Sequence, residues 1–383
     1  MPTSKLKLVH VSPRVQARGG VEALHRHHRK WNVRQHFVAL FDREPEPAAD
    51  YTNVNATWRM PLWKLRRAFA RAMTPHAGGV VIYHHLWGLP LFHDVDGAER
   101  RIVNCLGMPS YHEAELRASR GLVDGAMGIT PSLEPCWRET LPELREGRCA
   151  ILPMPVEAPA AVGRGRCESG GEMVIGYAGR LERRHKRVDR LPEFLRELKA
   201  RGRRFRFEVL GDGVWRERLE RETGNAVTFH GWTSKEEFWR VMSGWDAVVF
   251  FSEMEGGPLA LLEGCAVGAI PFFPAIGGSL GDLCAPKVDA RCHYPAGDMR
   301  ALAKAVDDVL GQTVEGIAAA RDRARNAVAG YGVGEYERAF LAFAEEMRAL
   351  PRISKRRRRR SRILDALPLG LATRLTPWAL RAS

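Results

Sequence analysis

Short apolar runs alternate with longer amphipathic stretches along the whole chain. This alternation is typical of repeated strand–helix units built around mostly parallel sheets. In the first half, amphipathic stretches such as Val21–Trp31 predict helices between the apolar runs. The runs themselves predict strands at Leu6–Val11, Phe37–Phe41, Val80–His85, Ile102–Leu106, Gly125–Thr130 and Ala150–Leu152.

Residues 153–172 interrupt this pattern, because they are rich in proline, glycine and small residues and have no periodicity, as expected of a linker. The pattern then restarts, with predicted strands at Met173–Tyr177, Phe205–Leu210, Val227–His230, Ala247–Phe251 and Ala269–Phe273. Predicted helices lie at Val188–Ala200, Lys235–Met242, Pro258–Val267, Met299–Leu310, Val314–Ala329 and Glu335–Ala349. We therefore expect an α/β protein with two αβα domains, residues 1–160 and 161–350, facing each other across a cleft at the carboxyl ends of their sheets.

The composition agrees with two folded domains. The chain has 383 residues, of which 45% are hydrophobic, enough for each domain to bury a core. No run of eighteen apolar residues occurs, and the N-terminus lacks the pattern of a secretory signal. The seven cysteines include no C-x-x-C pair, so we expect reduced, mostly buried thiols in a cytoplasmic protein rather than disulfides or a zinc site.

The positive charge is concentrated at the C-terminus. Residues 351–383 carry ten basic residues and one acidic residue, and so contribute +9 of the formal charge of +14. The basic run at residues 355–362 precedes an apolar stretch. Together, the two segments predict a basic amphipathic tail that docks on an anionic membrane surface. The competing interpretations are a solvated disordered tail, a terminal helix packed back on the first domain, and an arm that binds nucleic acid, the last of which we favour least.

Two loops have the composition of anion-binding sites. Gly19 and Gly20 close a loop directly before a predicted helix, where N–H groups can meet an anion, although glycine there also suits simple turn chemistry. In the second domain, Gly179 follows the first predicted strand and precedes Arg180 and Lys186. Two cations at a strand end predict a diphosphate site, and a solvated basic loop is the alternative.

The segment FFSEMEGGPLALLEGCAVGAIPFF carries the strongest signal. Gly256-Gly257-Pro258 predicts a tight turn into a helix, with the two glycine amides free to donate to sugar or phosphate oxygens. Glu255 precedes this turn, and Glu263 lies ~7.5 Å further along the helix axis. Glu263 stands in an otherwise apolar helix, where a carboxylate is costly without a partner, so we favour a ligand-binding role over a solvated surface position.

These residues resemble the retaining glycosyltransferases of family 4, which have the GT-B fold of two Rossmann-like domains. The resemblance covers nearly the whole body of the chain and is specific for the family, though not for any substrate. The matching segments are the Gly19-Gly20 loop, VVIYHHLWG, GRLERRHKRVDRL, VLGDGVW, VTFHGW and SEMEGGPLALLEGCAVGAIP.

The resemblance implies a metal-independent enzyme with no cofactor, which moves a sugar from a UDP- or GDP-sugar to a glycan or lipid-linked glycan of the cell envelope. It implies that Arg180 and Lys186 hold the donor diphosphate, that Glu255 contacts the transferred sugar, and that Glu263 binds the ribose. His85 would face the reacting sugar from the first domain, with His84 pointing the other way. The implied donor site further includes Gly19, Gly20, Gly179, Gly211, Gly213, Gly231, Trp232, Gly256, Gly257, Pro258 and Leu259.

Two positions depart from the family pattern. Arg187 stands where a glycine usually follows the lysine, and Gly264 stands where an alanine usually follows the second glutamate. Neither change removes a charged group, so the departures concern the geometry of the loops.

For three other patterns we expect a structural role and not a ligand site. We expect Asp94-Val95-Asp96 to lie in an exposed loop rather than to bind metal. We expect His25, His27 and His28 to form a solvated polar helix face. We expect Trp239 and Trp245 to be core residues.

Other functions remain open at this point. A glycosyltransferase that acts on a nucleic-acid base, or on another small acceptor, would use the basic tail to bind phosphates. A nucleotide-sugar-binding relic without activity is disfavoured by the intact Arg, Lys and Glu set. Dehydrogenase chemistry is disfavoured because neither domain has G-x-G-x-x-G after its first strand.

Overall fold

The computed structural model describes residues 6–16, 20–43, 45–145, 147–158, 172–276, 287–354 and 362–379. The chain forms two compact units. Unit 1 consists of Met1–Pro153 with Gly334–Ser383, and unit 2 of Met154–Val333. The chain therefore crosses from unit 1 to unit 2 and returns, so the segment after residue 334 lies with unit 1 rather than in the second domain and a separate tail.

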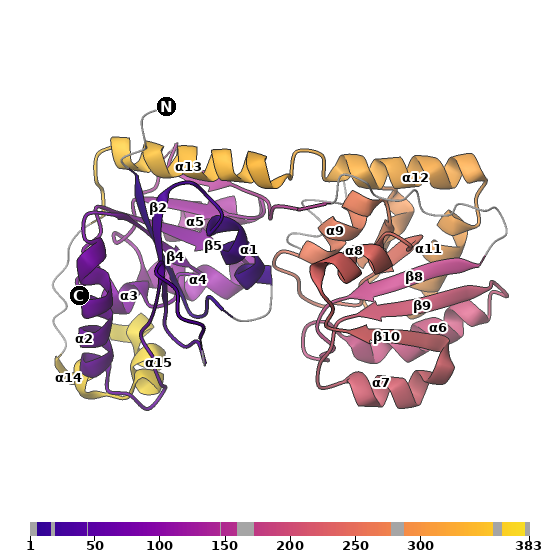
Figure 1. Ribbon diagram of the computed structural model, residues 1–383, viewed down its shortest axis with the longest axis horizontal. Helices are drawn as coiled ribbons and strands as arrows, with labels where there is room; N and C mark the ends of the chain where they lie inside the picture. The colour runs from indigo at the N-terminus through magenta and orange to yellow at the C-terminus, as the bar shows by residue number, and fades with distance from the viewer. Residues whose placement is uncertain are drawn as a thin grey trace. The chain divides into compact units, whose positions relative to one another are not determined.

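Unit 1 is built on a parallel sheet with the strand order β3-β2-β1-β4-β5-β6-β7 (Figure 1). Its strands are β1 (Lys7–Ser12), β2 (Arg34–Ala39), β3 (Tyr51–Asn53), β4 (Val80–His84), β5 (Arg100–Cys105), β6 (Gly125–Gly128) and β7 (Cys149–Ile151). Its helices are α1 (Gly20–His28), α2 (Leu62–Met73), α3 (Leu89–Phe92), α4 (Pro109–Ala118), α5 (Leu133–Thr140), α13 (Val333–Ala349), α14 (Arg362–Ala366) and α15 (Leu369–Ala379), with a 3₁₀ turn η1 at Thr74–His76.

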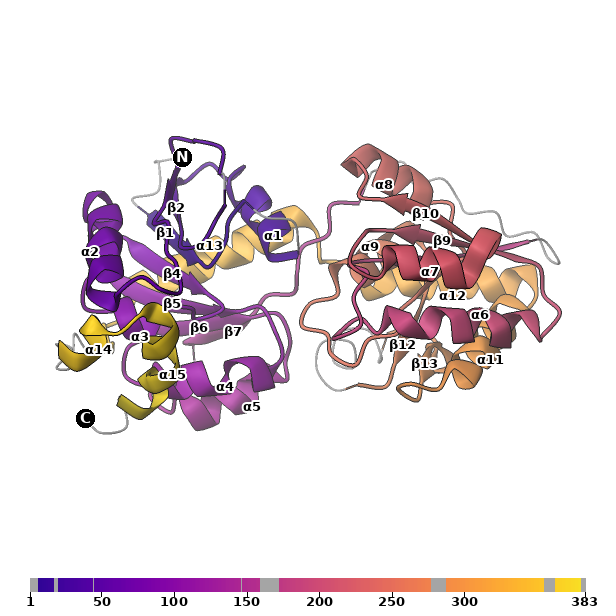
Figure 2. The same ribbon diagram turned by 90° about the horizontal axis from the view of Figure 1, so that it is seen from below.

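Unit 2 has a parallel sheet with the order β10-β9-β8-β11-β12-β13. Its strands are β8 (Met173–Ala178), β9 (Phe205–Leu210), β10 (Val227–Gly231), β11 (Ala247–Val249), β12 (Ile270–Pro274) and β13 (His293–Tyr294). Its helices are α6 (Leu191–Lys199), α7 (Arg216–Thr223), α8 (Lys235–Met242), α9 (Leu259–Val267), α11 (Met299–Leu310) and α12 (Val314–Ala327), with 3₁₀ turns η2 (Val188–Arg190), η3 (Gly224–Ala226) and η4 (Ala290–Cys292) (Figure 2).

The first four strands of each unit are arranged in the same order, β3-β2-β1-β4 in unit 1 and β10-β9-β8-β11 in unit 2. In each, the chain runs outward from a central strand (β1 or β8) and then crosses to its other side (β4 or β11). This reversal makes a crevice at the carboxyl ends of the two central strands, where open α/β sheets bind their ligands. The predicted α/β fold class with two Rossmann-like units is therefore confirmed.

The predicted strands all occur, with ends that differ by at most three residues. The short edge strands β3 and β13 were not predicted, because two or three residues are too few to carry a clear period-2 pattern.

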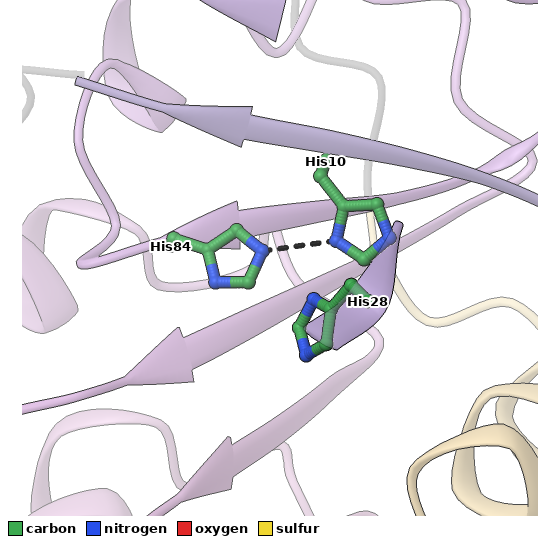
Figure 3. A group of neighbouring side chains, drawn as sticks. All are labelled: His10, His28 and His84. Atoms are coloured by element: carbon green, nitrogen blue, oxygen red, sulfur yellow. Dashed lines mark hydrogen bonds between the residues drawn. The ribbon is translucent and has the colours of Figure 1, made fainter. Parts of the chain in front are cut away.

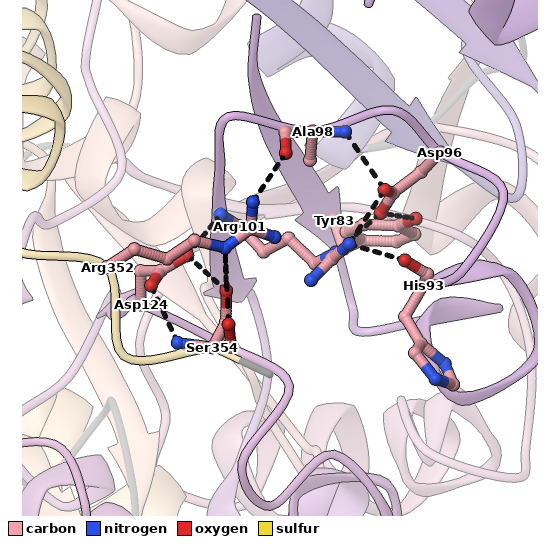
Figure 4. Close-up of polar contacts among 8 residues, drawn as sticks. All are labelled: Tyr83, His93, Asp96, Ala98, Arg101, Asp124, Arg352 and Ser354. Atoms are coloured by element: carbon pink, nitrogen blue, oxygen red, sulfur yellow. Dashed lines mark hydrogen bonds and ion pairs between the residues drawn. The ribbon is translucent and has the colours of Figure 1, made fainter. Parts of the chain in front are cut away.

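The described part of the C-terminal segment packs on unit 1. Asp124, at the start of β6, accepts hydrogen bonds from the amides of Ile353 and Ser354, each at 2.9 Å, and from the Ser354 hydroxyl at 2.7 Å (Figure 4). Further on, Leu369 of α15 is fully buried in the core of unit 1. For these residues, a terminal helix packed back on the first unit is the interpretation that holds.

No helix among the described residues is long and apolar enough to cross a membrane.

Candidate active site at the carboxyl ends of the second sheet

Three glycine-containing loops meet at the carboxyl ends of β8, β9 and β10. The Gly179 amide donates to the Leu210 carbonyl at 2.9 Å, and the Gly211 amide donates to the Gly231 carbonyl at 2.8 Å. Gly211 has φ +135°, and a Cβ there would lie 2.0 Å from the Gly179 carbonyl oxygen. Only glycine lets the two backbones approach so closely.

The loop after β9 also packs against the loop after β8. A Cβ at Gly213 would lie 2.5 Å from the carbonyl oxygen of Leu181, whose amide donates to the Asp212 carbonyl at 3.0 Å. The backbones of the three loops therefore pack tightly against one another at the carboxyl ends of the strands, at Gly179, Gly211, Gly213 and Gly231.

Lys186 and Glu255 form the central ion pair of this site. The Lys186 ammonium lies 2.7 Å and 2.8 Å from the two carboxylate oxygens of Glu255. Ser252, three residues after the end of β11, donates its hydroxyl hydrogen to the same carboxylate. The Glu255 side chain is 4% exposed and the Lys186 side chain 21%. The structure thus brings the predicted lysine and the first predicted glutamate together at the β8/β11 crevice, and Ser252 is a partner that the sequence interpretation missed.

Arg180 is largely exposed and pairs with a residue of its own loop. Its guanidinium lies 3.7 Å from Glu182, and 60% of its side chain is exposed. The Arg180 carbonyl accepts a hydrogen bond from the Tyr177 hydroxyl at 3.0 Å, which fixes the backbone at the end of β8.

Arg187 explains the first departure from the family pattern. It has φ +48° and ψ +40°, the left-handed conformation in which glycine is unstrained. Its guanidinium donates to Asp189 at 3.0 Å and pairs with Glu253, which also pairs with Arg190. These ion pairs hold a strained loop and tie it to the segment after β11.

Glu263 lies on α9 and is 6% exposed. Its carboxylate lies 2.6 Å from the ammonium of Lys235, at the start of α8. Burial raises the pKa of Glu263, and the Lys235 charge opposes this shift only in part. Lys235 itself is 48% exposed and lies over the ring of Trp239 at 4.4 Å. The partner that a buried carboxylate requires is therefore a lysine of the neighbouring helix, which sequence spacing could not identify.

Packing explains Gly264, the second departure from the family pattern. A Cβ at Gly264 would lie 2.7 Å from Cγ1 of Val248 on β11, so α9 packs too closely on the sheet for an alanine.

The turn before α9 presents free backbone donors. The amides of Gly256 and Gly257 donate to no acceptor within the described residues, whereas the Gly257 carbonyl accepts from Leu259 at 2.8 Å. Pro258 is the N-cap, so the helix begins at Leu259 rather than at the proline. Trp232, after Gly231, is 48% exposed, while Trp239 and Trp245 are buried, as predicted for core residues.

Of the candidate residues in unit 1, Gly19 lies outside the described residues, and Gly20 is the first residue of α1. His85 follows β4 at φ +57°, and its ring lies 5.6 Å from that of His112. His84 instead lies 3.0 Å from His10, so the two neighbouring histidines contact different residues. Burial lowers the pKa of His85 to about 4.

The predicted exposed loop at Asp94-Val95-Asp96 is wrong. Asp96 is fully buried and accepts hydrogen bonds from Arg101, at 2.7 Å, and from the Tyr83 hydroxyl, at 2.9 Å (Figure 4). Asp94 is half-buried and pairs with Arg66 at 2.7 Å. The aspartates serve a buried ion-pair network, which satisfies their charge without a metal-ligand role.

The predicted solvated face of α1 is also wrong for two of its three histidines. His25 and His28 are fully buried against β1 and β4, because α1 lies directly on the sheet. Burial lowers the pKa values of both far below the usual range, so both rings are neutral at pH 7.

The comparisons with known proteins agree with this geometry. Residues 167–328 match the family model described as glycosyl transferases group 1. No curated protein matches the chain.

Several solved structures share the fold. The lipopolysaccharide outer core galactosyltransferase WaaB is 16% identical with a TM-score of 0.64, and the match covers 88% of this chain and 99% of that one. A glycosyltransferase from Rickettsia africae is 14% identical with a TM-score of 0.62, covering 90% of this chain and 98% of that one. TarM is 14% identical with a TM-score of 0.57, covering 73% of this chain, which spans 58% of TarM.

The matched region 167–328 contains the loop after β8, the segment after β11 and helix α9. Residues 167–328 therefore match the glycosyl transferases group 1, in a chain whose two Rossmann-like units have the GT-B fold.

Proposed function

We propose that this protein is a retaining glycosyltransferase that moves a sugar from a nucleotide-sugar donor to an acceptor. The observation that carries the proposal is the Lys186–Glu255 pair at the β8/β11 crevice, inside the matched family region. A cation and a carboxylate there suit the two halves of a donor, because the diphosphate is anionic and the sugar presents hydroxyl groups.

The chemistry follows from how charge develops. Departure of the nucleotide leaves positive charge on the anomeric carbon and negative charge on the diphosphate. In the proposed site, Arg180, Lys186 and the free amides of Gly256 and Gly257 stabilise that negative charge without a metal ion, each well-placed donor contributing about 3 kcal/mol. The acceptor then attacks on the face from which the diphosphate leaves, and a diphosphate oxygen takes the acceptor's proton.

Glu255 has two partners in this scheme. In the structure it holds Lys186 and Ser252. When a diphosphate shares Lys186, Glu255 becomes available to accept hydrogen bonds from the hydroxyls of the transferred sugar. Glu263, further along α9, would accept hydrogen bonds from the ribose hydroxyls. The ammonium of Lys235 beside it would keep the carboxylate ionised.

A panel of nucleotide-sugars screened by thermal shift tests the donor class. Neighbouring structures are described with UDP or a UDP-sugar bound, so UDP-sugars stand first in the panel, and GDP-sugars follow. A saturating donor at 100 times its Kd should stabilise the protein by about 2.7 kcal/mol. Lys186→Ala and Glu263→Ala should abolish the shift, while Arg183→Ala, on the same loop and 64% exposed, should retain it. No shift with any donor would reject the proposal.

We also propose that the acceptor is membrane-linked and that the protein works on the inner face of the membrane. Pro61 and Pro368 pair as a β-bridge, which places the segment before α2 beside α14 and α15. Large hydrophobic side chains are exposed on these segments, namely Trp58, Trp63, Ile363, Leu371 and Leu375. Exposed basic residues accompany them at Arg59, Lys64, Arg67, Arg71 and Arg374. Apolar and basic side chains together suit an anionic lipid surface.

Sedimentation with vesicles tests this part separately. The protein should bind vesicles that contain phosphatidylglycerol and not purely zwitterionic ones. Trp63→Ser with Ile363→Ser should weaken binding without changing donor affinity. Equal binding by this variant would contradict docking through this surface, and tighter binding to duplex DNA than to vesicles would favour the nucleic-acid alternative.

A further inference from the structure

Four histidine rings are buried together in unit 1, and none of them is among the residues assigned above to the donor site. His10 lies on β1, His25 and His28 on α1, and His84 on β4, and each is fully buried. Histidine is seldom buried in such numbers, and a group of neutral imidazoles within reach of one another is a metal-ligand set.

The nitrogens of three of these rings converge. One nitrogen from each of His10, His28 and His84 lies within 4.8 Å of the other two (Figure 3). His10 Nδ1 and His84 Nε2 are 3.0 Å apart. In a tetrahedral zinc site with zinc–nitrogen bonds of 2.0–2.1 Å, ligand nitrogens are ~3.4 Å apart. In the structure this pair is hydrogen-bonded, so a metal ion would replace the shared proton and the two rings would separate by a few tenths of an ångström, to ~3.4 Å.

The cluster is poorly satisfied without a ligand. Within the described residues, Nε2 of His10 and both ring nitrogens of His25 and His28 have no hydrogen-bond partner, although all are buried. A buried polar atom without a partner costs about 1–3 kcal/mol. A metal ion bound by one nitrogen of His28 would remove that cost for this nitrogen, whereas His10 would bind through Nδ1, which already contacts His84.

The surroundings suit such an ion. The His10 ring stacks on Phe37 at 4.6 Å, and the His28 ring lies 4.9 Å from that of Phe340. An aromatic shell of this kind excludes water and strengthens metal binding. Asn104 Nδ2 lies 3.3 Å from His84 Nδ1, and the amide, turned by 180°, would accept a hydrogen bond from the N–H at that nitrogen and leave Nε2 for the metal.

We propose that His10, His28 and His84 bind one transition-metal ion of the zinc class. Three imidazoles without a thiolate or carboxylate select Zn²⁺, Co²⁺, Ni²⁺ or Cu²⁺ over Mg²⁺ and Ca²⁺. His25 also packs on this group, since its ring centroid lies 4.5 Å from that of His84.

The ion would fasten α1 to the sheet. His28 is the last residue of α1, and Gly20 is the first, so a metal that joins His28 to β1 and β4 fixes the helix whose N-terminus follows the glycine loop. The site is thus a structural clamp that is independent of the proposed transfer reaction.

Metal analysis of the full chain, prepared without a histidine tag, tests the proposal. The protein is expressed with added Zn²⁺, dialysed, and its zinc content is measured by plasma mass spectrometry. We expect about one zinc per chain in the wild type and at least a ~10-fold lower content in His28→Gln and His84→Gln. His76→Gln is the matched control, because His76 belongs to a separate stacked pair with His36, and it should retain the zinc.

Far-UV circular dichroism shows whether the glutamine variants fold. If they do not, X-ray absorption on the zinc-loaded wild type decides, since the proposal requires three imidazole nitrogens at about 2.0–2.1 Å. A wild type that retains no stoichiometric zinc, variants that fold and bind zinc equally, or a spectrum without imidazole ligands would each overturn the proposal.

Discussion

Lys186 and Glu255 lie 69 positions apart in the chain, yet the lysine ammonium contacts both oxygens of the glutamate carboxylate, at 2.7 Å and 2.8 Å. The pair joins the loop after β8 to the segment after β11, the two strands between which the strand order reverses. A ligand at this crevice would meet both residues at once. The residue that we assign to the sugar therefore holds in place the cation that we assign to the diphosphate.

Substitution of Arg187 separates backbone strain from ion pairing. Arg187→Ala and Arg187→Gly both remove the pairs with Asp189 and Glu253, but only glycine also relieves the left-handed backbone at φ +48°. The glycine variant should be more stable than the alanine variant by about 1 kcal/mol. Urea unfolding of both variants measures this difference. Equal stability would mean that the loop relaxes and the strain is not stored there.

Gly264→Ala should destabilise unit 2 by about 1–3 kcal/mol, because the new Cβ would meet Val248 at 2.7 Å. The same change in a Val248→Ala background should cost little, since the clash is removed and alanine is the better helix former. Thermal unfolding of the four proteins gives the coupling energy. Equal losses in both backgrounds would contradict the packing explanation.

Asp124 should be the anchor of the C-terminal segment. Asp124→Ala leaves the amides of Arg101, Ile353 and Ser354 without their acceptor, so it should cost at least ~3 kcal/mol. Ser354→Ala removes only a hydroxyl and should cost about 1 kcal/mol. Urea unfolding gives both values, and limited proteolysis should cut Asp124→Ala sooner after residue 350. A small effect of Asp124→Ala would show that other contacts hold the segment.

Acid should destabilise the protein through buried neutral histidines. Burial lowers the pKa of His36 to about 4 and that of His112 to about 3, whereas the unfolded chain titrates near 6.5. The unfolded state therefore binds more protons below pH 6.5, and stability falls as the pH falls from 6.5 towards 4. Each histidine should account for roughly 2 kcal/mol at pH 5. His112→Gln should make the dependence of urea unfolding on pH shallower, and an unchanged slope would contradict this assignment.

Local patterns predicted the parallel sheets, and they singled out Lys186 and Glu255, which the structure brings together at the second sheet. The strand ends there carry glycines and charged residues whose placement depends on short-range geometry. Gly211 and Gly213, for example, are required by the backbone of the neighbouring loop. The return of the C-terminal helices to unit 1 could not be derived, since an amphipathic stretch after a basic run suits lipid and protein surfaces equally. The same limit applies to His25 and His28, whose burial depends on where α1 packs and not on the polarity of the helix itself.

A transfer assay with the preferred nucleotide-sugar tests directly whether Lys186 and Glu255 act on the donor. Release of the nucleotide is measured for the wild type, Lys186→Ala, Glu255→Gln and the exposed control Arg183→Ala, each checked for folding by circular dichroism. We expect at least ~100-fold lower kcat/KM for Lys186→Ala, and a loss for Glu255→Gln, with the control unchanged. Folded Lys186→Ala protein that turns over the donor at the wild-type rate would contradict it.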